Sequence, residues 1–111
     1  MKISIVIPCY NEKDTIVEII NRVKKENNYE KEIIVIDDYS TDGTRKILQE
    51  KLSKEVDKLI LNEKNLGKGY SVKQGIKEAS GNIILIQDAD LEYDPSDYSK
   101  LVEPIKKGYA D

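Results

Sequence analysis

The sequence predicts an open, mostly parallel α/β sheet with helices on both faces. Short runs rich in Ile, Val and Leu alternate with longer segments whose apolar residues recur with helical period. Acidic and polar residues directly follow three of the four runs, at the strand ends where ligands bind in sheets of this kind. No tract rich in Gly, Ser or Pro interrupts the pattern, so we expect a single domain over residues 1–111.

The four predicted strands are short and close to continuously apolar, and the third shows this least clearly. Such a composition is typical of strands that are covered on both faces. The strands span Ile3–Pro8, Glu32–Asp37, Asp57–Leu61 and Asn82–Gln87.

Three helices are expected between the strands, each marked by an apolar stripe at helical spacing. The second follows the turn-forming segment Ser40–Gly43, and the third ends at Gly81, just past its last turn. The stripes are Ile16, Ile19, Ile20 and Val23 in the first helix, Ile47, Leu48 and Leu52 in the second, and Val72, Ile76 and Ala79 in the third.

A fourth helix is expected to begin at Asp94, an N-cap residue that is followed by Pro95 at the first helical position. Pro104 cannot donate a helical hydrogen bond, so we expect this helix to kink or stop there. Its apolar stripe is Tyr98, Leu101, Val102 and Ile105.

The composition excludes several kinds of chemistry. With no His and a single Cys, the chain cannot build a Cys/His zinc site or a His-dependent nucleophile, and a reducing, cytoplasmic setting is expected. The net charge of −3 is a poor match to nucleic acid, and no apolar run approaches the ~20 residues that cross a bilayer. The sequence leaves open whether the chain forms a homo-oligomer.

The strongest candidate site is the acidic segment after the fourth strand. In an extended chain, Asp88, Asp90 and Glu92 point the same way and can converge on one ion. Ligands that are all oxygens suit Mg²⁺ or Mn²⁺. The alternative is a solvated acidic loop at a helix N-terminus, where the helix dipole favours acids.

Other candidates are each compatible with a structural role. Asp38, with its neighbour Asp37, could accept hydrogen bonds from a base or ribose, or one of the pair could cap the turn that follows. Lys68, in a Gly-Lys-Gly helix start, could meet a phosphate, although the formal phosphate-binding motifs are absent. Tyr10 and Glu12 could bind a base, or Glu12 could simply begin the first helix. Cys9 is expected to be a small buried side chain without reactivity.

Several short motifs occur in order over essentially the whole chain. They are VIPCYNE at 6–12, VIDDYSTDGT at 35–44, NLGKG at 65–69, ASGN at 79–82 and DADLEYDP at 88–95. With these motifs the chain resembles the family 2 glycosyltransferases, whose nucleotide-sugar domain has the Rossmann-like GT-A fold. The last motif resembles the branch that includes dolichyl- and polyprenyl-phosphate mannose or glucose synthases.

The resemblance implies a role for each matching position. Pro8, Tyr10 and Glu12 would line the nucleoside pocket, Ile36 and Asp38 would hold the base, and Asp88 with Ala89 would lie against the ribose and diphosphate. Asp90 would ligate Mg²⁺ or Mn²⁺, with Glu92 beside it where relatives often carry Gln. Tyr39 replaces a small or polar residue and would alter the pocket rim.

The implied activity is metal-dependent, inverting transfer of a hexose from a UDP- or GDP-sugar to an acceptor, with a polyprenyl phosphate as the leading candidate. Such an acceptor is already ionised at pH 7, so the lack of a His base matters less. Family members continue beyond the metal motif, so we expect 1–111 to be the donor-binding part. Acceptor-side catalytic residues would lie beyond Asp111, in a relative at the cytoplasmic face of a membrane. The alternative is a non-catalytic nucleotide- and metal-binding module or an inactive fragment.

Overall fold

The structure confirms a parallel sheet of four strands. It is a computed structural model that describes residues 2–91, 95, 98, 100 and 102–103. All strand pairs are parallel, and the strand order is β3-β2-β1-β4. The strands are β1 (Lys2–Cys9), β2 (Glu30–Asp37), β3 (Lys58–Leu61) and β4 (Ile83–Ile86). Because all four run the same way, the loops that follow them gather at one edge of the sheet.

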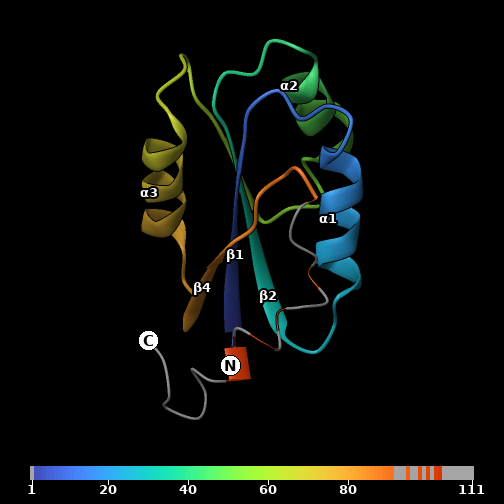
Figure 1. Ribbon diagram of the computed structural model, residues 1–111, viewed down its shortest axis with the longest axis vertical. Helices are drawn as coiled ribbons and strands as arrows, with labels where there is room; N and C mark the ends of the chain where they lie inside the picture. Colours follow the sequence, from blue (N-terminus) through green and yellow to red (C-terminus); the bar gives the residue numbers. More distant parts are fainter. Residues whose placement is uncertain (1, 92–94, 96–97, 99, 101, 104–111) are drawn as a thin grey trace.

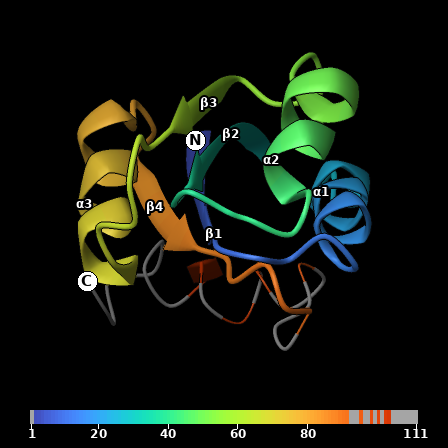
Figure 2. The ribbon, with the colours of Figure 1, turned by 90° about the horizontal axis from the view of Figure 1, so that it is seen from above.

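Helices cover both faces of the sheet, as expected (Figures 1 and 2). On one face lie α1 (Ile16–Lys25) and α2 (Thr44–Ile47), which continues into a π-helical turn, η1 (Leu48–Leu52). On the other face lies α3 (Lys68–Glu78). Within the described part of the chain, no helix has the length and apolar character needed to cross a membrane.

The main core lies between the sheet and α1, α2 and η1. The predicted stripe of α1 is buried throughout, and Leu48 and Leu52 are buried as predicted for the next helix. The fourth predicted helix, with its start at Asp94 and its break at Pro104, lies largely outside the described residues. Of its stripe, Tyr98 and Val102 are described and belong to this core.

The packing face of α3 differs from the prediction. We expected Val72, Ile76 and Ala79 to face the sheet, but Ile76 is 44% exposed, and the buried residues of α3 are Ser71 and Gly75. A Cβ at Gly75 would lie 2.3 Å from Val6 Cγ1, so the helix sits too close to β1 for a larger residue. The helix also ends at Glu78, before Gly81.

The two faces of β4 are not equally buried, contrary to the expectation from its apolar run. Ile83 and Leu85 belong to the main core, whereas Ile84 and Ile86 are 39% and 41% exposed. Among the described residues, β4 pairs only with β1, and α3 packs on β1 and β2. The second face of β4 is therefore only partly covered.

A buried carboxylate links the strands at a distance from the loops of the carboxyl edge. Glu32 accepts hydrogen bonds from Ser4 Oγ at 2.6 Å and from Ser80 N at 2.9 Å, and Lys58 Nζ lies 3.4 Å from its Oε1. Burial raises the pKa of Glu32, but the hydrogen bonds from Ser4 and Ser80, with the charge of Lys58, outweigh burial and lower it from 4.5 to about 2. Glu32 is therefore ionised in the folded protein.

This shift predicts how stability changes with pH. Because the folded pKa is depressed, the contribution of Glu32 is complete above about pH 4.5 and disappears as the pH falls towards 2. Glu32→Gln is expected to lower the free energy of unfolding by at most about 3 kcal/mol at pH 7, and the difference from wild type should shrink below pH 4.5. Urea unfolding at pH 7, 4 and 2.5 measures this. If the difference in free energy of unfolding between wild type and Glu32→Gln stayed constant with pH, the charge of Glu32 would not be what stabilises the fold.

Candidate functional site

A cavity of about 430 Å³, lined by both polar and apolar groups, opens at the carboxyl edge of the sheet. Four separate segments form it: the ends of β1 and β2, the loop and helix start after β3, and the segment after β4. Its volume is in the range of small-molecule sites. It is lined by Pro8, Cys9, Tyr10, Glu12, Asp38, Asn65, Gly67, Lys68, Ser71, Asp88, Ala89 and Asp90.

The structure brings almost all of the predicted nucleotide-sugar residues to this cavity. Ile36 is the exception: its side chain is fully buried in the core with Val6 and Ile34, and its Cδ1 faces Gly75 of α3. Alternation along β2 turns Ile36 towards that helix. Glu92 lies outside the described residues. Tyr39 does not line the cavity, and the guanidinium of Arg45 lies 5.6 Å from its ring centroid.

Four lining residues were not predicted as site residues: Cys9, Asn65, Gly67 and Ser71. Asn65 and Gly67 belong to the NLGKG motif, from which only Lys68 was singled out. Gly67 has φ +96, a left-handed value that explains a glycine immediately before α3. Ser71 is fully buried, and the stripe pattern missed it because the packing face of α3 is made of small residues.

Asp38 shapes one wall of the cavity. Its carboxylate accepts hydrogen bonds from the backbone N–H groups of Leu66 at 2.8 Å and Gly67 at 2.9 Å, and from Asn62 Nδ2 at 3.0 Å. Asn65 Nδ2 donates to the Asp38 carbonyl at 3.3 Å. Asp38 is 4% exposed, so these bonds satisfy a buried charge while fixing the segment that leads into α3.

Asp37 is a structural residue of the next loop, as the alternative for the Asp pair anticipated. It accepts hydrogen bonds from Ser40 N at 3.1 Å and Ser40 Oγ at 2.6 Å, and it pairs with Arg45 Nη1 at 3.2 Å.

Burial, with the nearby Asp37 carboxylate, strongly raises the pKa of the Cys9 thiol. Cys9 is therefore a neutral, buried donor rather than a nucleophile, as predicted.

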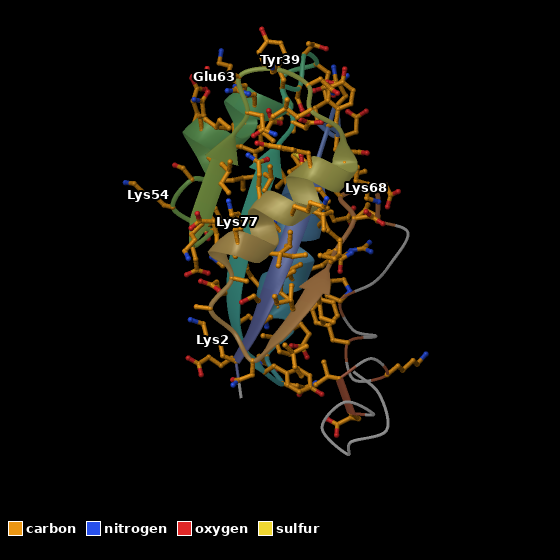
Figure 3. All side chains as sticks on the ribbon, turned by 90° about the vertical axis from the view of Figure 1, so that its left-hand side faces the viewer. Lys2, Tyr39, Lys54, Glu63, Lys68 and Lys77 are labelled. Carbon is orange, nitrogen blue, oxygen red and sulfur yellow. The ribbon has the colours of Figure 1, made fainter. Side chains whose placement is uncertain are left out.

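The acidic segment after β4 carries a close ion pair. Lys68 Nζ lies 2.5 Å from Asp88 Oδ1, and Lys68 occupies the end of α3 nearer the carboxyl edge (Figure 3). Thr15 Oγ1 donates to the Ala89 carbonyl at 2.5 Å and so ties this segment to the start of α1. Both residues of the ion pair are well exposed, so the pair contributes little to the stability of the fold. Its effect is to hold two opposite charges beside the cavity.

The premise of alternating side chains does not hold in this segment. The chain turns at Ala89 and Asp90, and Leu91 has a left-handed φ of 67°. Within the described residues, no three acidic or Cys side chains converge on one point. Asp88 and Asp90 do both line the cavity.

A parallel sheet with a cavity at its carboxyl edge is the arrangement of ligand-binding domains of the open α/β class. The chain belongs to glycosyl transferase family 2, whose family model matches residues 4–111. It is 41% identical over 111 residues to the dolichol-phosphate mannosyltransferase of Pyrococcus furiosus, a match that covers 97% of this chain and 31% of that protein.

Solved structures give the same result for the fold. The S. aureus TarS 1–349 structure in complex with UDP-GlcNAc matches all of this chain with a TM-score of 0.81 and 29% identity, over 33% of its own length. The mannosyltransferase PcManGT from Pyrobaculum calidifontis, in complex with GDP-Man and Mn²⁺, matches 79% of this chain with a TM-score of 0.70 and 27% identity, over 27% of its own length. The chain thus spans about a third of the length of the proteins it matches.

Proposed function

We propose that this chain is the donor-binding part of a metal-dependent, inverting glycosyltransferase that transfers a hexose from a UDP- or GDP-sugar to a polyprenyl phosphate. The observation that carries the proposal is the convergence of residues from four separated motifs on one cavity at the carboxyl edge. The relatives point the same way, since one is named for dolichol phosphate and two solved neighbours hold a nucleotide sugar.

The charges around the cavity suit a diphosphate held with a cation. Asp88 and Asp90 supply oxygen ligands, which hard divalent ions prefer, and the ion pair with Lys68 supports the ability of Asp88 to bind a cation there. These residues fit Mg²⁺ or Mn²⁺, with Glu92 as a further candidate ligand. Such an ion would supply Lewis-acid stabilisation of the departing nucleoside diphosphate.

The residues of the chain have distinct tasks in this proposal. Pro8, Tyr10 and Glu12 bound the nucleoside, and the wall fixed by Asp38 faces the base. Lys68 exchanges Asp88 for a phosphate oxygen when the donor binds, which keeps its charge paired. An ionised lipid phosphate attacks the anomeric carbon directly and needs no His base. Because the chain spans about a third of its relatives' length, we assign acceptor binding to the rest of a full-length protein, and we place that protein at the cytoplasmic face of a membrane.

Titration calorimetry with UDP and GDP, with and without Mn²⁺, tests the donor site. Wild type is expected to bind one of the two in a Mn²⁺-dependent way, and Asp90→Ala should weaken that binding about tenfold or more by removing a ligand charge. Asp14→Ala removes an exposed carboxylate outside the cavity and is the matched control. Equal binding by wild type and Asp90→Ala would refute the role given to Asp90.

The alternative function is binding of nucleotide and metal without catalysis, for which the residues of the cavity would also suffice. Incubation with a nucleotide sugar and a short polyprenyl phosphate separates the two. Mn²⁺-dependent nucleotide binding without sugar transfer supports the module for this chain alone, whereas formation of the glycosyl phosphate contradicts it.

A further inference from the structure

The loop that carries Tyr10 and Glu12 is held by the loop after β2. Three consecutive backbone N–H groups of the first loop donate to side-chain oxygens of the second. Asn11 N lies 2.9 Å from Ser40 Oγ, Glu12 N lies 2.9 Å from Thr44 Oγ1, and Lys13 N lies 3.3 Å from Asp42 Oδ2. In return, Thr41 N donates to Asn11 Oδ1 at 2.7 Å.

Each hydroxyl in this contact is itself fixed by a carboxylate. Ser40 Oγ donates to Asp37 Oδ1 at 2.6 Å, and Thr44 Oγ1 donates to Asp42 Oδ1. Burial raises the pKa of Asp42, but hydrogen bonds from Thr44 and from the Lys13 amide outweigh burial and lower it. With their hydrogens turned to ionised carboxylates, the hydroxyls present lone pairs to the Asn11 and Glu12 amides.

The first loop needs such support because its backbone leaves regular structure. Asn11 has φ 54, in the left-handed region, and α1 does not begin until Ile16. Tyr10 is 47% exposed, so packing of its side chain does not by itself fix the loop. By contrast, Thr44 is fully buried and Ser40 nearly so, which makes the second loop the rigid partner.

We propose that Ser40, Asp42 and Thr44 are positioning residues, which set the place of Tyr10 and Glu12 in the cavity through the backbone amides of residues 11–13. This role rests on the proposed function, because it assumes that Tyr10 and Glu12 contact the nucleotide. The motif after β2 would then have two separate tasks. Asp38 fixes the 62–67 segment, and Ser40, Asp42 and Thr44 fix the first loop.

The test uses a pair of variants at Thr44. Thr44→Val keeps the shape but removes the acceptor, and Thr44→Ser keeps the hydroxyl. Thr44→Val is expected to weaken UDP or GDP binding in Mn²⁺ about tenfold by misplacing the loop, and Thr44→Ser to stay close to wild type. Unchanged affinity in a folded Thr44→Val protein overturns the proposal.

A double-mutant cycle separates positioning from stability. In a Tyr10→Ala/Glu12→Ala background, Thr44→Val should change nucleotide affinity less than twofold, since the side chains that it positions are gone, while its effect on Tm should persist. The same tenfold loss in both backgrounds contradicts positioning through this loop.

Amide exchange by NMR keeps the proposal testable if wild type binds neither nucleotide, which would refute the proposed function alone. Thr44→Val should raise exchange at residues 11–13 more than tenfold over the exchange in Thr44→Ser, with the β1 amides protected in both. Equal exchange in the two variants overturns the proposal. If Thr44→Val does not fold, Ser40→Ala serves, with increased exchange expected at Asn11, and unchanged exchange there overturns the proposal.

Discussion

Gly75→Ala is expected to destabilise the protein by about 1–3 kcal/mol, and Gly75→Leu by more. An added Cβ would lie 2.3 Å from Val6 Cγ1 and 2.8 Å from Ile36 Cδ1. Both of those side chains are fully buried and have no room to retreat, so α3 must lift from the sheet. Because Lys68 and Ser71 lie on α3, this shift would also disturb the cavity. Chemical denaturation in urea measures the loss.

Gly69→Ala is the matched control in the same helix. No atom lies within 4 Å of an added Cβ at Gly69. The substitution should therefore change stability only through the higher helix propensity of alanine, which would raise the free energy of unfolding by about 1 kcal/mol. Opposite signs at the two glycines are the expected result. A Gly75→Ala protein as stable as wild type would show that α3 does not pack as closely as described.

Asp38→Ala is expected to cost about 2–4 kcal/mol and to release the wall of the cavity. It removes the acceptor of three hydrogen bonds and leaves the Leu66 and Gly67 amides without their partner. We expect both a lower free energy of unfolding for the whole domain and a local loosening of the 62–67 segment. Urea unfolding gives the stability, and amide exchange by NMR should show faster exchange at Leu66 and Gly67.

Asp38→Asn separates charge from shape at this position. It retains one oxygen acceptor, so we expect an intermediate loss of stability and partial protection of the two amides. Nucleotide affinity should follow the same order, with wild type tightest and Asp38→Ala weakest. If Asp38→Ala kept both amides protected, the carboxylate would not be what holds the 62–67 segment.

The architecture was predictable because burial dominates it. The α1 stripe and the strand runs appear in the sequence as apolar periodicity, and the structure confirms them. The face of α3 was wrong because close contact selected Ser71 and Gly75, which carry no hydrophobic signal. The spacing of apolar residues in a sequence does not indicate how closely a helix packs against a sheet.

The site was predictable where motif and topology agree. Parallel strands necessarily bring Tyr10, Asp38 and Asp88 to one edge, and the cavity joins them. The side chain of Ile36 does not line the cavity, because alternation along β2 turns it into the core towards α3. The chain turns at Ala89 and Asp90, so the segment after β4 is not extended as expected, and the spacing of acidic residues does not indicate such a turn. Joint metal binding by Asp88, Asp90 and Glu92 stays a prediction, because Glu92 lies outside the described residues.

The cavity is proposed to bind a nucleoside diphosphate together with a divalent ion. Crystals grown with Mn²⁺ and UDP or GDP, measured at a wavelength where manganese scatters anomalously, test this binding. We predict an anomalous peak inside the cavity, within ligand distance of a carboxylate oxygen of Asp88 or Asp90, which would hold the ion. An ordered nucleotide bound elsewhere, or an Mn²⁺ peak that touches neither carboxylate, would contradict the account.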